Sequence, residues 1–151
     1  MLPERVYKTP ISVLVVIHTP TLLVLLLERA DHPGYWQSVT GSLDADELHA
    51  RAAQREVFEE TRIDASRHVL TDWNLQYEFE IFEEWRHRYE PGVTRNTEHV
   101  FGLCVSRADT VTVHAREHLG FIWLPWQEAA EKVFSWTNKA AILKLPEKFA
   151  G

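Results

Sequence analysis

Short apolar segments in the first part of the chain predict a pair of strands. ISVLVVI, residues 11–17, is apolar throughout and rich in β-branched residues, as expected of a buried strand. TLLVLLLER, residues 21–29, follows after a short turn and is predicted to pair with it as a hairpin. DHPGYW, residues 31–36, contains a Pro-Gly pair and therefore predicts a loop.

A second hairpin is predicted further along the chain. LQYEFEIF, residues 75–82, alternates strictly between apolar and polar positions, and EHVFGLCV, residues 98–105, returns after a long polar loop. VTVHA, residues 111–115, and GFIWL, residues 120–124, predict two more short strands. The strands therefore lie on both sides of the middle of the sequence.

Helical spacing of alanine, leucine and valine predicts a central helix from Leu48 to Thr61. Helical sequence also begins at Trp126, and again from Thr137 to the end. Strands before and after a central helix predict a sandwich of the α/β (α+β) class with a mixed sheet.

Composition narrows the class of protein. A chain of 151 residues with 45% hydrophobic and 25% charged residues suits one domain with a single core. A net charge of -6 argues against nucleic acid or an anionic membrane as partner, so an anionic substrate needs local positive charge or a metal. The single cysteine, Cys104, and the lack of a secretory signal or membrane-spanning segment predict a cytoplasmic protein.

The predicted central helix carries an unusual acidic cluster, REVFEE. Glu56, Glu59 and Glu60 stand at i, i+3 and i+4, so a helix places them on one face. Like charges at this spacing repel by about 0.2–0.5 kcal/mol per pair. Carboxylates grouped in this way suit a hard cation such as Mg²⁺, and the ordinary alternative is a solvated acidic helix face.

The segment from Gly41 to Ile63, GSLDADELHARAAQREVFEETRI, resembles the Nudix box of a hydrolase family. Eight positions match that pattern: Gly41, Glu47, Arg55, Glu56, Val57, Glu59, Glu60 and Ile63. One position departs from it, because Arg62 occupies the place of the second glycine, where a left-handed helix cap is usual. The departure leaves the carboxylates intact and bears on how the helix ends.

The resemblance implies a Nudix α/β/α sandwich with a mixed β-sheet over residues 1–151 and hydrolysis that depends on Mg²⁺, with Mn²⁺ as an alternative. It implies that Arg55 belongs to the catalytic machinery and that Glu47 pairs with it rather than binding metal. Glu59 and Glu60 are both candidates for the general base, and the residues do not choose between them.

Segments outside the box resemble the bacterial Nudix subfamily that hydrolyses dihydroneopterin triphosphate in folate biosynthesis, and which also acts on dATP. These segments are YWQSVTGSL, EFEIF, RHRYEPGVTRNTEH, EHLGFIWL and SWTNKAAI. The resemblance implies cleavage between the α and β phosphates, giving dihydroneopterin monophosphate and pyrophosphate. It places metal ligands at Glu56, Glu60 and Glu117; taken alone, Glu117 would be an exposed loop carboxylate.

The same resemblance implies a set of substrate contacts, each with an ordinary alternative. For the charged and hydroxyl groups the alternative is a surface charge, a turn hydroxyl or a helix cap, and for the segment around residue 80 it is a core face of the sheet. The implied contacts are Lys8, Arg29, Thr40, Phe79, Glu80, Ile81, Phe82 and Ser135.

A loop rich in basic groups and two rival functions complete the sequence-based picture. Arg86, His87, Arg88 and Arg95 predict a lid over a triphosphate, or alternatively a solvated loop.

The partner is expected to be a small pterin or nucleoside triphosphate, with no nucleic acid and no membrane, and the oligomeric state stays open. The rivals are a housecleaning nucleotide pyrophosphatase and a non-catalytic Nudix module that binds an effector.

Overall fold

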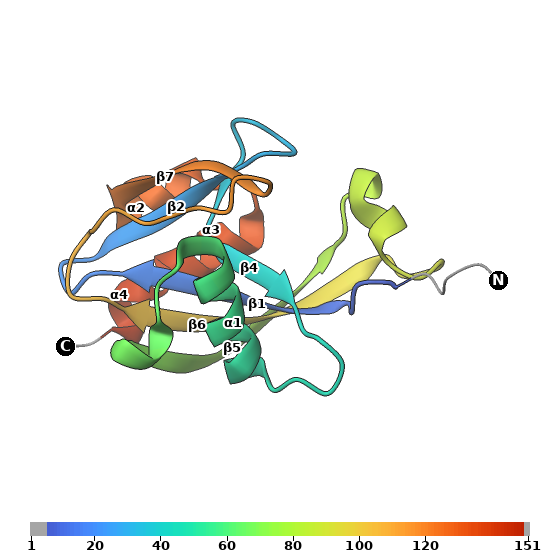
Figure 1. The fold of residues 1–151 in the computed structure, drawn as a ribbon, viewed down its shortest axis with the longest axis horizontal. Coiled ribbons are helices and arrows are strands. Elements are labelled where there is room, and N and C mark those ends of the chain that lie inside the picture. Colours follow the sequence, from blue (N-terminus) through green and yellow to red (C-terminus); the bar gives the residue numbers. More distant parts are fainter. Residues whose placement is uncertain (1–5, 150–151) are drawn as a thin grey trace.

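The computed structural model describes residues 6–149, which form one mixed seven-stranded sheet between helices. Hydrogen-bonded neighbours follow the order β3-β2-β1-β6-β5, while β4 pairs with β1 and β7 with β2 (Figure 1). The strands are β1 Ile11–His18, β2 Leu23–Arg29, β3 Trp36–Gln37, β4 Val39–Ser42, β5 Val69–Glu80, β6 Arg95–Cys104 and β7 His118–Pro125.

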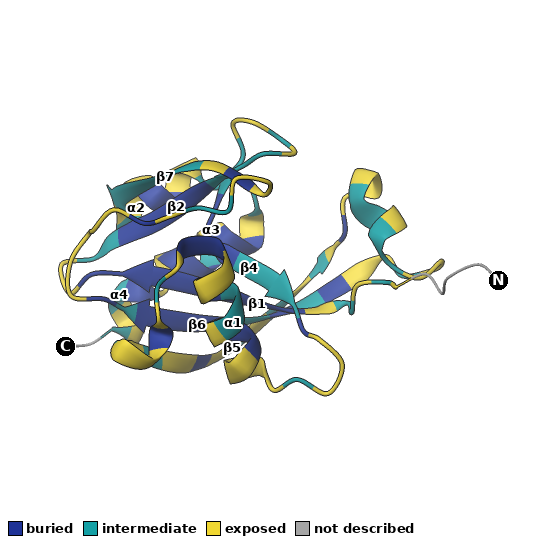
Figure 2. Cartoon of the chain, in the orientation of Figure 1, coloured by how far each residue is buried: buried dark blue, intermediate teal, exposed yellow. Residues whose placement is uncertain are grey.

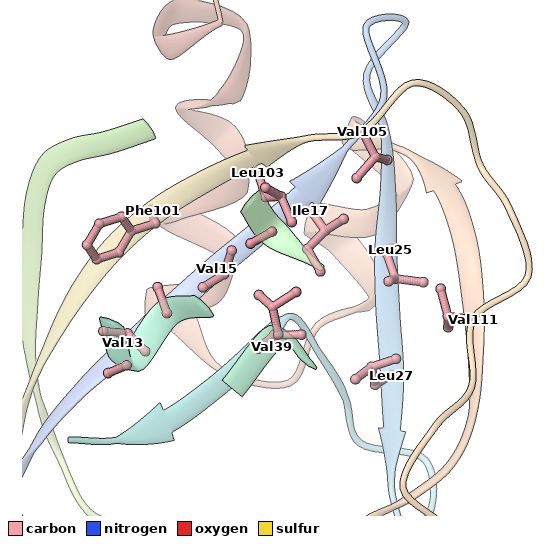
Figure 3. Packing of buried hydrophobic residues seen from close by; sticks show 14 of the residues in the cluster. Val13, Val15, Ile17, Leu25, Leu27, Val39, Phe101, Leu103, Val105 and Val111 are labelled. Atoms are coloured by element: carbon pink, nitrogen blue, oxygen red, sulfur yellow. The ribbon is translucent and has the colours of Figure 1, made fainter. Parts of the chain in front are cut away.

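Strand β1 is central because its side chains are apolar on both faces. Val13, Val15 and Ile17 belong to the core cluster under α1, His49–Thr61 (Figure 3). Leu14 and Val16 belong to the cluster on the opposite face of the sheet. The strand pairs in parallel with β6 and antiparallel with β2 and β4. The predicted hairpin of the first two strands and the predicted mixed sheet are both confirmed.

Helices cover both faces of the sheet and make it a sandwich. Helix α1 lies in front of the sheet in Figure 1, and α2 Trp126–Lys132, α3 Trp136–Leu143 and α4 Leu145–Lys148 lie behind it. Buried residues gather along the central strands, and the outer helix faces and loops are exposed (Figure 2). In the part of the chain that is described, no helix is long and apolar enough to cross a membrane.

Helix α1 ends with a left-handed residue although the usual glycine is absent. Arg62 has φ 65° and ψ 10°, and its backbone N–H donates to the Phe58 carbonyl at 2.9 Å. Its guanidinium lies 5.2 Å from the centroid of the Phe58 ring. A non-glycine residue in this region costs about 1–2 kcal/mol, and the ring contact offsets part of that strain. The exit geometry of the helix is therefore kept.

Helix α3 is tied to the sheet by one buried amide. Asn138 Oδ1 accepts from the Ser38 backbone N–H at 2.8 Å, and its Nδ2 donates to Ser38 Oγ at 2.9 Å. Both residues are at most 1% exposed. This pair holds the start of α3 beside the junction of β3 and β4.

Replacing Asn138 with Ala is expected to lower the free energy of unfolding by about 2 kcal/mol, because the buried Ser38 N–H loses its acceptor. Urea denaturation followed by circular dichroism measures the loss. Lys139→Ala, one position along the same helix at a 46% exposed side chain, serves as the control and should change stability by less than about 0.5 kcal/mol. Equal losses in the two variants would contradict this role of Asn138.

Two predicted strands differ from those observed. The strand predicted at residues 75–82 runs from Val69 to Glu80, so Ile81 and Phe82 lie beyond it, and Phe82 precedes the 3-10 helix η2, Glu83–Arg88. The early part escaped prediction because a bulge at residues 72–75 and the positive φ of Asn74 break the alternation. A second 3-10 helix, η1, spans Ala65–Arg67.

The strand predicted at residues 111–115 is wrong, since this segment forms no strand. Val111 is buried and Val113 packs against the same core cluster, which accounts for the alternating pattern. Its neighbour is the end of a helix, because Thr112 N–H donates to the Thr61 carbonyl at 3.3 Å. Alternation here reflects anchoring of a loop on the core rather than a sheet.

Candidate active site

A cavity of about 1030 Å³ opens where α1, β4, η2, the turn before β7 and the start of α3 meet. Three kinds of side chain line it. Carboxylates come from α1, cations come from the segment before β1 and from β2, and aromatic rings come from β5, η2 and the segment before α3. All thirteen residues expected to act lie on its wall: Lys8, Arg29, Thr40, Arg55, Glu56, Glu59, Glu60, Phe79, Glu80, Ile81, Phe82, Glu117 and Ser135.

The three carboxylates of α1 differ sharply in environment. Glu60 is 1% exposed, the side chain of Glu56 is 12% exposed, and that of Glu59 is 52% exposed. Burial raises the pKa of Glu56, and burial together with the facing Glu56 carboxylate raises the pKa of Glu60 well above its usual range. The helix face predicted to carry all three therefore turns Glu56 and Glu60 inward and leaves Glu59 near solvent.

The Glu60 carboxylate is buried, but its two oxygens lack hydrogen-bond donors from residues 6–149. Its carboxylate lies near Glu56 and the Thr40 backbone, and 3.6 Å from Nε2 of buried His118. No donor within residues 6–149 completes a hydrogen bond to either of its oxygens. Because burial lowers the pKa of His118, its ring is neutral at neutral pH and offers Glu60 no full positive charge. A buried acid without donors calls for a cation or a proton.

Gly41 leaves the room that Glu56 occupies. A Cβ built on Gly41 would lie 2.1 Å from Glu56 Cδ and 2.3 Å from its Oε1. No larger residue fits beside that carboxylate without moving it. The glycine of the motif is thus required by close approach of strand and helix rather than by a turn.

Arg55 joins four carboxylates into one network. It donates to Glu47 through Nε and Nη2 at 2.9 and 2.8 Å and to Glu56 through Nη1 at 2.7 Å, with Glu59 at 3.4 Å and Asp44 at 3.4 Å. Its Nη2 also donates to the Ser42 carbonyl at 3.0 Å. The expected pairing of Glu47 with Arg55 is present, and it fixes the α1 carboxylates against β4.

The pairing of Glu47 with Arg55 makes stability depend on acid pH. The Arg55 guanidinium lowers the pKa of Glu47 to about 2, below its ordinary value of 4.5. A depressed carboxyl contributes stability above pH 4.5, and this contribution is lost as pH falls towards 2. We expect the melting temperature of Glu47→Gln to approach that of the unsubstituted protein as pH falls through this range. A constant difference from pH 7 to 2.5 would contradict the ion pair.

Cations form a second group on the cavity wall. Arg29 donates to both oxygens of Asp31 at 2.7 Å and to Gln37 at 3.0 Å, and Arg88 reaches Asp31 at 3.2 Å. Desolvation, together with the charges of Arg88 and Arg29, lowers the pKa of Lys8. Three cations thus lie within reach of one another, which suits several phosphate charges.

The other expected substrate contacts differ in burial and in their hydrogen-bond partners within the protein. Thr40 Oγ1 donates to the Val13 carbonyl at 2.9 Å, and Ser135 Oγ accepts from the Asn138 N–H at 3.2 Å as a helix cap. Ile81 is 3% exposed, whereas Glu80 is exposed and pairs with Arg86 at 3.4 Å.

The basic loop does not act as one unit. Arg88 lines the main cavity, but Arg86 and His87 line a second, smaller hollow. Arg95 stands in β6 and pairs with Glu78 at 2.7 Å. Of the four groups, only Arg88 is in place to meet a ligand of the main cavity.

Several wall residues were missed by sequence reasoning. Phe134 meets the stacked rings of Phe82 and Trp85 edge-on, and the Arg29 guanidinium lies 4.3 Å from the Trp85 centroid. Buried Glu98 also lines the cavity. A signal for Glu98 existed, since an acid at an inward position of a predicted strand breaks the apolar pattern.

The family model of the Nudix domain matches residues 8–145. The chain belongs to the Nudix family. This Nudix chain is 47% identical over 142 residues to the dihydroneopterin triphosphate diphosphatase of Escherichia coli K12, covering 92% of this chain and 93% of the relative. It is 44% identical over 141 residues to the Haemophilus influenzae protein of that name, covering 91% and 88%.

Solved structures agree with this Nudix assignment. The E. coli dihydroneopterin triphosphate pyrophosphohydrolase matches with a TM-score of 0.87 and 47% identity, over 93% of this chain and 97% of that one. A Listeria monocytogenes protein described as a Nudix hydrolase matches with a TM-score of 0.78 at 23% identity, over 94% and 95% of the chains, and shows the shared fold. The predicted sandwich with a mixed sheet is confirmed.

The Nudix carboxylates fit a divalent cation. Both oxygens of Glu60 are buried without a donor from residues 6–149, and Glu56 faces them, so a hard cation would supply the missing positive charge. Within the same described range, no three His, Cys, Asp or Glu side chains already converge as a complete metal cage. Exposed Glu117 stands on the same cavity wall, close enough for its charge to contribute to the raised pKa of Glu60.

Proposed function

We propose that this chain hydrolyses dihydroneopterin triphosphate to dihydroneopterin monophosphate and pyrophosphate. The proposal is carried by one observation: a buried Glu56–Glu60 pair, with both Glu60 oxygens lacking a donor from residues 6–149, shares one cavity with Lys8 and Arg29. Relatives that bear this activity in their names are 44–47% identical over most of the chain. We further propose that residues 1–151 form a single Nudix domain, and a cytoplasmic location stays a prediction.

Glu56, Glu60 and Glu117 would hold Mg²⁺, with Mn²⁺ as an alternative. When bound, the metal acidifies a water molecule and neutralises charge on the phosphates. Arg55 holds Glu56 at 2.7 Å in its working position. Glu59 or Glu60 accepts the proton of the attacking water. The side chain of Glu59 is 52% exposed, whereas Glu60 would accept the proton within the buried cluster.

The remaining wall residues would bind the substrate. Lys8 and Arg29 would pair with phosphate oxygens, and the Thr40 and Ser135 hydroxyls would contact the sugar-like side chain or the phosphates. Phe79, Glu80, Ile81 and Phe82 would border the ring. Phe79 and Phe82 both line the cavity, so a flat ring can pack against an aromatic wall.

A hydrolysis assay tests the proposal. The protein is incubated with Mg²⁺ and, in turn, dihydroneopterin triphosphate, dATP and an oxidised dGTP, and pyrophosphate is measured against orthophosphate. The highest kcat/KM with the pterin, and pyrophosphate as product, is expected. A higher kcat/KM with a nucleotide would favour the housecleaning pyrophosphatase, and no turnover of any substrate would favour an effector-binding module.

A further inference from the structure

Two buried polar side chains on β6 line the cavity with an acceptor oxygen to spare. Asn96 is 2% exposed and Glu98 is 5% exposed. Asn96 Nδ2 donates to Ser12 Oγ at 2.7 Å, yet Asn96 Oδ1 and Glu98 Oε1 find no donor within residues 6–149. Buried acceptors are normally paired, so two unpaired ones on one cavity wall point to donors brought by a ligand.

The sheet register places these acceptors on the opposite side of β4 from the α1 carboxylates. Gly41 faces Glu56, so Thr40, one position earlier, faces the other side, where it contacts Glu98. Thr137 of α3 also contacts the Glu98 carboxylate. Glu98 therefore forms part of the cavity floor under α3, apart from the proposed site of phosphate hydrolysis.

Aromatic side chains border this floor. Cross-strand partners share a face, and Phe79 lies opposite Asn96 while Tyr77 lies opposite Glu98. Trp136, at the start of α3, lines the cavity and meets the Tyr77 ring at 5.7 Å between centroids. A flat heterocycle bordered by Phe79 and Trp136, which both line the cavity, would direct its polar edge at the floor.

We propose that Glu98 is a specificity-determining residue that binds the 2-amino-4-oxo edge of a pteridine ring, with Asn96 Oδ1 accepting from a further ring donor. The inference rests on the proposed function and deepens it. That edge presents a ring N–H beside an amino group, two adjacent donors that match a carboxylate. Guanine carries the same pair of donors, whereas the corresponding edge of adenine offers one donor beside an acceptor.

The environment of Glu98 suits this task. Burial raises its pKa to about 7, while the Thr137 and Thr40 hydroxyls act in the opposite direction. Two ring donors would favour the ionised form, because charge-assisted hydrogen bonds are stronger than neutral ones. A buried carboxylate with one oxygen, Oε1, left without a donor from residues 6–149 discriminates against rings that lack the donors.

The test is a change in substrate preference in Glu98→Gln. The glutamine amide keeps the shape but presents a donor where the pterin edge also has one. We expect kcat/KM to fall by about 10- to 100-fold with dihydroneopterin triphosphate and with GTP, and by less than about threefold with dATP. Isothermal titration calorimetry without metal should show a similar loss of affinity for 7,8-dihydroneopterin, which carries no phosphate.

Controls separate this inference from folding and from the proposed function. Glu78→Gln replaces a carboxylate on the neighbouring strand whose side chain is 56% exposed, and it should keep the unsubstituted preference. If Glu98→Gln does not fold, Glu98→Asp serves instead, because it keeps the charge and withdraws it by one methylene. Its kcat/KM should still fall more with dihydroneopterin triphosphate than with dATP. Unchanged preference in a folded variant would overturn the inference while leaving pterin hydrolysis by the unsubstituted protein intact.

Failure of the proposed function gives a different pattern. The unsubstituted protein would then release no pyrophosphate from the pterin triphosphate. Calorimetry with 7,8-dihydroneopterin still decides the inference in that case. Binding that Glu98→Gln loses supports the ring contact, and no binding by the unsubstituted protein overturns it.

Discussion

Glu60→Gln is expected to lower kcat by about 100- to 10,000-fold, which is the range that a proton-transferring group contributes. The amide has the shape of the carboxylate, so the change removes charge and basicity and little else. Steady-state release of pyrophosphate measures the effect. Glu59→Gln, assayed alongside, identifies the base, because only the residue that accepts the proton should flatten the acid limb of the pH profile of kcat. Activity of Glu60→Gln within about threefold of the unsubstituted protein would remove Glu60 from the reaction.

The same substitution is expected to raise thermal stability in the absence of metal. Burial and Glu56 raise the pKa of Glu60, so the folded state favours its protonated form. A raised carboxyl pKa gives stability that is present below the ordinary value near 4.5 and lost as pH rises through the folded pKa. The melting temperature of Glu60→Gln in a chelator should therefore exceed that of the unsubstituted protein, increasingly so at higher pH.

Added Mg²⁺ should reverse this order, since a ligand that binds the folded state stabilises it. The unsubstituted protein is expected to gain more in melting temperature from the metal than Glu60→Gln does. Glu131→Gln, at a side chain 75% exposed on α2, is the matched control and should follow the unsubstituted protein under both conditions. An identical response of all three proteins to chelator and metal would contradict a cation site at Glu60.

Local signals account for what the sequence could predict. Strand β1 is apolar at nearly every position, and α1 carries its motif within one continuous segment, so neither depends on distant residues. The cluster of Glu56, Glu59 and Glu60 is likewise a matter of helical spacing. Their unequal burial is not, because it depends on how α1 packs over β4 and the turn before β7.

The rest of the site depends on contacts between segments far apart in the chain. The environment of Glu98 combines Ser12, Tyr77 and Thr137, which meet only through strand register and the packing of α3. A bulge of one residue in a strand such as β5 turns the following side chains to the other face of the sheet. The periodicity of the sequence does not reveal such a shift. Patterns therefore located the charged groups of the cavity better than its buried floor.

Gly41→Ala is expected to reduce kcat/KM by about 100-fold, because displacing a reacting group by about 1 Å has that effect. The added methyl would lie 2.1 Å from Glu56 Cδ, and Glu56 is also held by Arg55 at 2.7 Å, so the carboxylate and its partner must move together. Overpacking of this kind should lower the free energy of unfolding by about 1–3 kcal/mol. Enzyme kinetics and urea denaturation measure the two losses.

Gly120→Ala is the matched control for this change, since a Cβ on Gly120 meets nothing within 4 Å and its backbone is not left-handed. The double variant Gly41→Ala with Glu56→Asp shortens the carboxylate and makes room for the methyl group. The double variant should lose less free energy of unfolding than the two single variants lose in sum, which indicates direct contact between the two sites. Strict additivity, or losses in Gly41→Ala no larger than in Gly120→Ala, would mean that the strand does not fix the position of Glu56, and the role of the glycine would have to be sought in the substrate instead.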